Sequence, residues 1–195
     1  MFTSCFRAIL SIQFLALMLS SQLAFAQQPV RTIFLVRHAE KVSNDPDATL
    51  SPAGLKRAEC LAGMLKDAGI KEILVSDKKR TQQTAEPLAQ SLKITPKILP
   101  ANDYGNLTRN ALYQGNGNVL IVGHGDTLPN IIARMKAGNI APIADNDYER
   151  LYEITAIEGS VTPVVTLHYC QAGGAPASSA KPAASPSPKK TPSKK

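Results

Sequence analysis

Two arginines and two histidines follow apolar runs of the sequence and have the chemistry to handle phosphate. Arg37 and His38 come directly after the run TIFLV, Arg80 lies four residues after EILVS, and one glycine separates His124 from NVLIV. A guanidinium fork matches the oxygens of a phosphoryl group. An imidazole that nearby positive charge keeps neutral can attack phosphorus. If these side chains meet, they form a pocket for a compact, multiply charged anion.

The elements that must position these residues alternate along the chain. Apolar, β-branched stretches at 32–36, 71–76 and 118–123 predict buried strands, each followed by a helix. Strands that alternate with helices favour an α/β fold, and we expect a three-layer α/β/α arrangement around a mostly parallel central sheet. In such sheets ligands bind beyond the carboxyl ends of the strands, where the following helices point their N-termini.

The helices and the last strands have recognisable boundaries. Ser51 and Pro52 are typical of a helix start and Gly69 of its end, with apolar residues at helical spacing between them: Leu55, Ala58, Leu61, Ala62 and Leu65. Pro87 is expected to kink the helix over 80–92 or to mark its true start. A short extended piece at 93–99, a helix at 107–114 and a strand pair at 150–157 and 161–170 complete the pattern, with Pro163 indicating an edge or a bulge.

The three strand ends resemble the motifs of a known family. VRHAEK, RTQQTAEPLA and IVGHGDTLPN, in this order, are similar to the motifs of the histidine phosphatase (phosphoglycerate-mutase-like) superfamily, in its short branch with little sequence for a lid. The resemblance covers nearly all of 30–170. It implies a phosphoglycerate-mutase-like fold, His38 as the nucleophile that becomes phosphorylated, Arg37 and Arg80 as phosphoryl ligands, and His124 as the second pocket histidine.

The resemblance leaves the acid that protonates the leaving oxygen with two candidates. Many relatives have a Glu after the second motif, and this chain offers Asp103 at that place, although Asp103 could equally be a turn residue of ANDYGN. Asp126, offset by one residue, is similar to an Asp that directly follows the second histidine in the other branch. We expect Asp103 to be the donor, with Asp126 as the alternative. Asn44 matches a polar phosphate contact in some relatives.

The family implies a phosphohydrolase that removes a phosphoryl group from a phosphate ester or phosphoprotein through a phosphohistidine on His38. One alternative is a non-catalytic module that binds a phosphorylated ligand and has lost the acid. A phosphomutase is a third reading, for which the domain has little sequence to build a lid that shields the intermediate from water. No cofactor or metal is expected, because the H-x-E at 38–40 lacks a P-C-x-x-C partner and no H-E-x-x-H occurs.

The ends of the chain differ from its centre. Residues 1–26 have the layout of a secretory signal peptide: Arg7, an apolar run and Ala24-Phe25-Ala26. We therefore expect a phosphatase domain at 27–170 that is periplasmic or secreted, with no membrane span once the signal is removed. Residues 171–195 are rich in Ala, Pro, Ser and Lys, which favours a disordered basic tail, either solvated or touching anionic surfaces.

The sequence also predicts how charge is distributed and what the two cysteines of the domain can do. Of the formal charge of +7, the tail supplies five lysines and Arg7 one unit, so the domain itself is close to neutral and no nucleic acid is expected as a partner. Lys78 and Lys79 are expected to be solvated charges. Glu40 and Lys41 either shape the pocket mouth or face water. Cys60 and Cys170 can form a bridge in an oxidising compartment or remain two separate thiols.

Overall fold

The central sheet runs through the whole described part of the protein. The computed structural model describes residues 30–157 and 160–170, so the expected signal peptide and basic tail lie outside the described residues. The strands have the order β3-β2-β4-β1-β5-β6, with β7 also paired to β5. Their bounds are β1 Val30–Arg37, β2 Ile70–Ser76, β3 Lys97–Leu99, β4 Asn118–Gly123, β5 Arg150–Ile157, β6 Ser160–Val161 and β7 Val165–His168.

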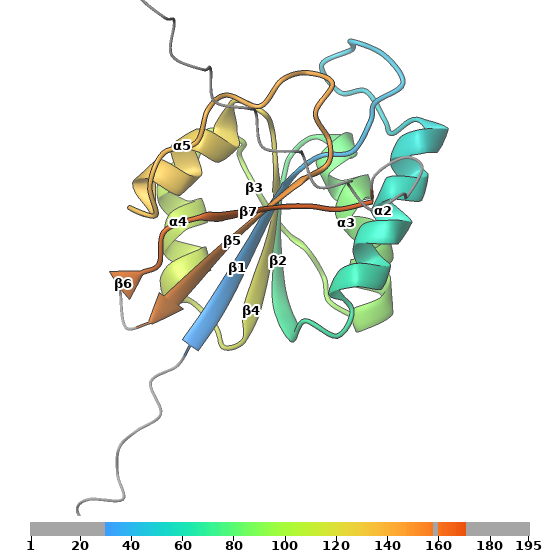
Figure 1. The fold of residues 1–195 in the computed structure, drawn as a ribbon. Helices are drawn as coiled ribbons and strands as arrows, with labels where there is room; N and C mark the ends of the chain where they lie inside the picture. Colours follow the sequence, from blue (N-terminus) through green and yellow to red (C-terminus); the bar gives the residue numbers. More distant parts are fainter. Residues whose placement is uncertain (1–29, 158–159, 171–195) are drawn as a thin grey trace, which may run out of the picture.

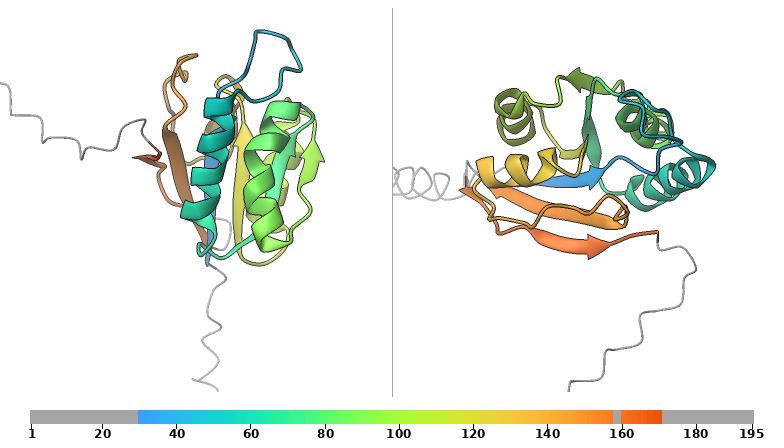
Figure 2. Two further views of the ribbon diagram at one scale, coloured as in Figure 1. Left: turned by 90° about the vertical axis from the view of Figure 1, so that its right-hand side faces the viewer. Right: turned by 90° about the horizontal axis from the view of Figure 1, so that it is seen from above.

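Helices cover both faces of this sheet. Figures 1 and 2 show α2 (Pro52–Leu65) and α3 (Lys79–Leu92) on one face and α4 (Tyr104–Tyr113) and α5 (Thr127–Arg134) on the other. The pairs β1/β4, β2/β4 and β2/β3 are parallel, while β5 runs antiparallel to β1. β5 is also antiparallel to β6 and β7, so the sheet is mixed, with parallel pairing among β1 to β4. The expected α/β fold with helices on both faces of a central sheet is confirmed.

Alternating side chains of the strands fill two hydrophobic cores. Ile33 and Leu35 of β1 join the cluster beneath α4 and α5, while Val36 joins the cluster beneath α2 and α3. β4 divides its side chains in the same way, with Val119 and Ile121 in the first cluster and Leu120 and Val122 in the second. Since successive strand residues point to opposite faces, a strand that is buried on both sides must be continuously apolar.

Helix α2 starts where the sequence predicts, ends earlier, and buries the predicted face except at Leu55. The Ser51 side chain accepts a hydrogen bond from the Gly54 backbone, and Pro52 occupies the first turn. The helix ends at Leu65, and Gly69, with φ of +66°, follows as part of a turn. Leu55 is 47% exposed, contrary to the helical pattern, whereas Arg57 is only 9% exposed. The apolar spacing therefore missed a buried cation in this helix.

Pro87 lies inside a helix and Pro163 lies between two short strands. α3 begins at Lys79 and continues through Pro87, so Pro87 does not mark its start. Pro163 lies between β6 and β7, and these two short strands replace the single strand expected over 161–170. Both pair with β5, and proline has no N–H to continue the ladder. The residues 158–159 of the expected turn lie outside the described residues.

The register of the sheet brings the ends of three strands together. Arg37 at the end of β1 pairs with Gly123 at the end of β4, and Val75 of β2 pairs with Val122 of β4. The residues that follow these positions consequently share one edge of the sheet. Within the described ranges, no helix is long and apolar enough to span a membrane.

Candidate active site

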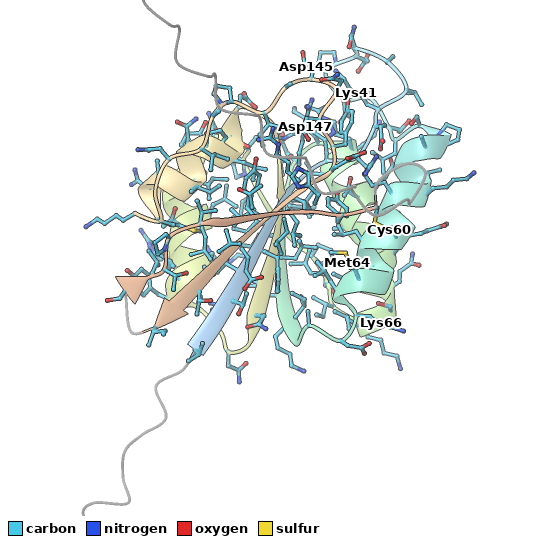
Figure 3. All side chains as sticks on the ribbon, in the orientation of Figure 1. Lys41, Cys60, Met64, Lys66, Asp145 and Asp147 are labelled. Carbon is cyan, nitrogen blue, oxygen red and sulfur yellow. A yellow bond between two sulfur atoms is a disulfide. The ribbon has the colours of Figure 1, made fainter. Side chains whose placement is uncertain are left out.

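A pocket of about 430 Å³ lies at this edge, beyond the carboxyl ends of β1, β2 and β4. The structure brings four of the predicted site residues together in it: Arg37, His38, Arg80 and His124. In Figure 3, Lys41 and Asp145 mark the same end of the molecule. The full lining consists of Arg37, His38, Lys41, Lys78, Arg80, Ala101, His124, Gly125, Asp126, Thr127, Pro142, Ile143 and Asp145.

His38 is buried at the end of β1 with one ring nitrogen occupied. Its Nδ1 lies 2.8 Å from the carbonyl oxygen of Ala39, and the Ala39 N–H in turn donates to Thr84 Oγ1 at 2.9 Å. A carbonyl only accepts, so Nδ1 carries the proton and Nε2 keeps a lone pair. Burial lowers the pKa of His38 to about 3, and the charges of Arg37 and Arg80 act in the same direction. The ring is therefore neutral at physiological pH.

His124 has the opposite tautomer. Arg80 Nη2 donates to its Nδ1 at 3.3 Å, and its Nε2 lies 2.9 Å from Ser76 Oγ. Because a guanidinium only donates, Nδ1 accepts and Nε2 carries the proton. Burial lowers the pKa of His124 to about 4, with Arg80 the next cause. The rings of His38 and His124 lie 5.3 Å apart between centroids.

Ser76 is a site residue that the sequence reasoning missed. Its buried hydroxyl contacts Thr81 Oγ1 at 2.9 Å and accepts from the Lys78 N–H at 3.2 Å. Thr81 Oγ1 lies 2.8 Å from the Lys78 carbonyl, to which it donates. Because the Thr81 hydroxyl donates to that carbonyl, its oxygen accepts from the Ser76 hydroxyl. Ser76 Oγ is therefore the acceptor for Nε2–H of His124. The signal was available, since Ser76 is the polar last residue of a buried strand at the same sheet edge.

Both arginines line the pocket, and each has one N–H donor that no described residue accepts from. Arg37 Nη1 donates to the Ala144 carbonyl at 2.5 Å, and its guanidinium lies 4.6 Å from the Tyr148 ring centroid. Arg80 Nη1 donates to the Pro46 carbonyl at 2.7 Å. The Nε atoms of both arginines are buried and have no hydrogen-bond partner among the described residues. Buried donors normally have partners, so an anion in the pocket is the fitting acceptor.

The structure separates the two candidate acids. Asp103 is not among the lining residues; it caps α4 and accepts from the Asn106 backbone N–H at 3.1 Å and from Asn106 Nδ2 at 2.6 Å. These hydrogen bonds lower the pKa of Asp103, which is the wrong direction for an acid. Asp126 lies in the pocket wall. Contrary to the expected order of the two candidates, the position of the pocket favours Asp126 over Asp103 as the proton donor.

The other predicted residues divide between the pocket and the surface. Lys41 and Lys78 line the pocket, whereas Lys79 pairs with Asp47 at 3.2 Å. Asn44 is exposed and is not part of the lining. Glu40 is not part of the pocket lining; it is partly buried and pairs with Arg57 at 2.8 Å. The structure also joins Cys60 and Cys170 in a disulfide. No group of three or more His, Cys, Asp or Glu side chains suited to a metal occurs among the described residues.

Sequence comparisons point to one superfamily. Residues 33–102 match the family model of the histidine phosphatase superfamily (branch 1). Proteins named probable phosphoglycerate mutase GpmB are 36% identical over 85 residues in Proteus mirabilis (strain HI4320) and 33% over 70 residues in Yersinia pestis (strain Pestoides F). These matches cover 38% and 32% of this chain, and only 40% and 33% of the length of the relatives.

Comparison with solved structures shows the same fold over the whole domain. The protein histidine phosphatase SixA complexed with tungstate superposes with a TM-score of 0.58 at 20% identity, covering 70% of this chain and 96% of that one. The alpha-ribazole phosphatase from Shigella flexneri gives a TM-score of 0.51 at 18% identity, with 68% and 94% coverage. The predicted phosphoglycerate-mutase-like fold is thus confirmed, while the resemblance to the superfamily rests on the match over residues 33–102.

Proposed function

We propose that this protein of the histidine phosphatase superfamily is a phosphohydrolase that works through a phosphohistidine on His38. The observation that carries the proposal is the state of the two histidines in a pocket with two arginines. Nε2 of His38 is unprotonated, and Arg37 and Arg80 each supply a buried Nε donor that no described residue accepts from. A neutral imidazole next to donors for charged oxygens is the arrangement that nucleophilic attack on a phosphoryl group requires.

The first half-reaction forms the phosphoenzyme. His38 Nε2 attacks phosphorus, the N–P bond forms, and the bond from phosphorus to the leaving oxygen breaks. Arg37 and Arg80 hold the equatorial oxygens, where charge accumulates in the transition state, and the His124 ring lines the pocket beside them. Asp126, in the pocket wall, donates its proton to the leaving oxygen, so the product departs as a neutral alcohol.

The second half-reaction restores the enzyme. Water attacks the phosphoryl group of phosphohistidine while the Asp126 carboxylate takes its proton, the N–P bond breaks, and inorganic phosphate leaves with His38 neutral again. The reverse roles of one carboxylate in the two steps follow from microscopic reversibility.

The positive charge of the pocket supports phosphate esters and phosphoproteins as the substrate class. Lys41 and Lys78 add positive charge to the lining beyond the four central side chains. The solved relatives are described as a protein histidine phosphatase and an alpha-ribazole phosphatase, which makes protein-bound and small-molecule phosphates the two arms to compare. We also propose that the domain works in the periplasm or outside the cell, since its disulfide suits an oxidising compartment.

A panel of phosphates tests the activity and separates it from the alternatives. Wild type and His38→Ala are assayed, with a chelator present, on p-nitrophenyl phosphate, phosphohistidine, a nucleoside 5′-phosphate and 3-phosphoglycerate. Phosphate release and an acid-labile phosphoenzyme in wild type, both lost in His38→Ala, support the proposal. Phosphate binding without turnover would favour the non-catalytic module. The exposed position of Asp126 is the observation that favours this alternative. Isomerisation of 3-phosphoglycerate would favour a mutase.

A further inference from the structure

The end of the described chain is tied to helix α2 behind the active site. Cys60 of α2 and Cys170, two residues after β7, form a disulfide with their Cα atoms 6.1 Å apart. The Cys170 backbone has φ of +48°, a left-handed conformation that non-glycine residues adopt only when their surroundings hold it. The disulfide supplies such a constraint, because it holds Cys170 next to α2 and so limits where the Cys170 carbonyl can lie.

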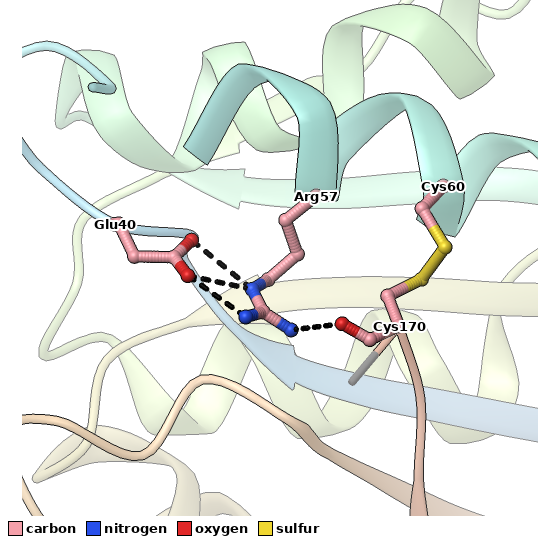
Figure 4. Close-up of a disulfide and its surroundings, with 4 residues drawn as sticks. All are labelled: Glu40, Arg57, Cys60 and Cys170. Carbon is pink, nitrogen blue, oxygen red and sulfur yellow. Dashed lines mark hydrogen bonds and ion pairs between the residues drawn. A yellow bond between two sulfur atoms is a disulfide. The ribbon is translucent and has the colours of Figure 1, made fainter. Parts of the chain in front are cut away.

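That carbonyl is one of the two partners of the buried Arg57. Arg57 Nη1 donates to the Cys170 oxygen at 3.0 Å, and on its other side the guanidinium forks onto Glu40, with Nε 3.0 Å from both carboxylate oxygens and Nη2 2.8 Å from Oε1 (Figure 4). The planar fork can satisfy both partners only in one orientation. Arg57 therefore links the disulfide-bonded segment to Glu40.

Glu40 in turn belongs to the segment that sets His38. It lies two residues after His38, and its carbonyl accepts from the Ser51 N–H at 2.8 Å, next to the first turn of α2. The intervening Ala39 is fully buried against Leu50 and Ala58. Since the Ala39 carbonyl is the partner of His38 Nδ1, a displacement at Glu40 moves the group that fixes the His38 tautomer and ring orientation.

We propose that Arg57 and Glu40 are positioning residues for His38 and that the Cys60–Cys170 disulfide holds them in place, so that reduction of the disulfide slows phosphoryl transfer. The inference rests on the proposed function. Reduction takes two electrons and two protons from a dithiol, which becomes a disulfide, and yields two free thiols. The Cys170 carbonyl is then free to move and no longer holds Arg57 in one orientation. The Glu40 carboxylate in turn loses its fixed partner, while the residues that contact phosphate stay unchanged.

The test compares this pair with a matched pair at the other end of the sheet. Arg31 and Glu72 also form a buried 2.8 Å ion pair, and Arg31 likewise donates to backbone carbonyls, those of Asn110 and Gly117. We expect Arg57→Lys, Glu40→Gln and the double variant Cys60→Ser/Cys170→Ser to lower kcat about tenfold or more, with KM within about twofold, because small misplacement of a nucleophile is costly. Arg31→Lys and Glu72→Gln should lose stability with kcat unchanged.

Two further measurements make the outcome decisive. In full-length wild type, dithiothreitol should lower kcat reversibly at a temperature where circular dichroism shows the fold intact. The ¹⁵N shifts of the His38 ring should show mixed tautomers after reduction. Unchanged kcat and unchanged shifts in the folded, reduced protein would overturn the inference, as would an equal loss of kcat in the control pair. If the oxidised protein turns over no phosphate, the proposed function has failed, and the His38 shifts alone decide the positioning role.

Discussion

The rings of His38 and His124 lie 5.3 Å apart between centroids, with their planes 62° from parallel, and they carry their protons on different nitrogens. The Ala39 carbonyl holds the proton on Nδ1 of His38, while Arg80 and Ser76 together place it on Nε2 of His124. One ring thus has the bare nitrogen that a nucleophile needs. The other has a nitrogen beside Arg80 that can take a proton when a phosphoryl dianion raises its basicity.

The first prediction concerns Ser76, whose hydroxyl selects the tautomer of His124. In Ser76→Ala, Nε2–H loses its buried acceptor, and the ring is expected to turn or to mix tautomers. We expect kcat to fall about tenfold or more, because a catalytic group out of place by a fraction of an ångström is costly. The ¹⁵N shifts of His124 measure the tautomer directly. Ser91→Ala, which removes a serine hydroxyl bonded to a helix carbonyl on α3, serves as the control and should change neither quantity.

The second prediction separates the two candidate acids. Asp126→Asn should lower kcat by about 10² or more on alkyl phosphates, whose leaving oxygen needs a proton, and far less on p-nitrophenyl phosphate. Asp103→Ala should instead lower the melting temperature, because it removes the cap of α4, and leave kcat unchanged. The reverse pattern of kcat would restore Asp103 as the donor.

The third prediction uses two glycines of the same helix. A Cβ on Gly54 would lie 2.2 Å from the Glu40 carbonyl oxygen, whereas a Cβ on Gly63 meets nothing within 4 Å. Alanine is favoured over glycine in a helix by about 1 kcal/mol. Gly63→Ala should therefore raise the free energy of unfolding by up to that amount. Gly54→Ala should lower both stability and kcat, since Glu40 and the adjoining His38 segment must move. Equal melting temperatures for the two variants would contradict this account.

The fourth prediction is a loss of stability at mildly acidic pH. The pKa values of His38 and His124 are lowered to about 3 and about 4 in the folded protein, mainly by burial, from 6.5. As the pH falls below 6.5, the unfolded chain binds protons that the folded protein does not. The stability present above pH 6.5 is consequently lost on acidification, by up to about 2 kcal/mol per histidine at about pH 5.

Urea denaturation between about pH 7.5 and pH 5 measures this slope. His38→Gln should flatten it, because the variant has one fewer group that titrates between the two states. A slope that is the same in wild type and His38→Gln would show that buried histidines do not control acid stability here.

Much of the candidate active site could be predicted from hydrophobic periodicity and from the geometry of parallel strands. Arg37, His38 and His124 were predictable as neighbours because each follows an apolar strand, and parallel strands end at one edge of a sheet. Ser51 and Pro52 marked the start of α2 for a similarly local reason, the need of the first turn for acceptors. These inferences depend only on residues that lie close together in the sequence.

The sequence by itself therefore determined the α/β order of elements, the apolar strands and the set of side chains at their carboxyl ends. Only the tertiary structure decided which acid enters the pocket, which nitrogen of each histidine is free, and that Arg57 is buried between Glu40 and Cys170. The physical reason is that tautomers, ion pairs and disulfides depend on side-chain directions and on contacts between residues far apart in the chain. Hydrophobic periodicity records which face of an element is buried, and not which partner that face meets.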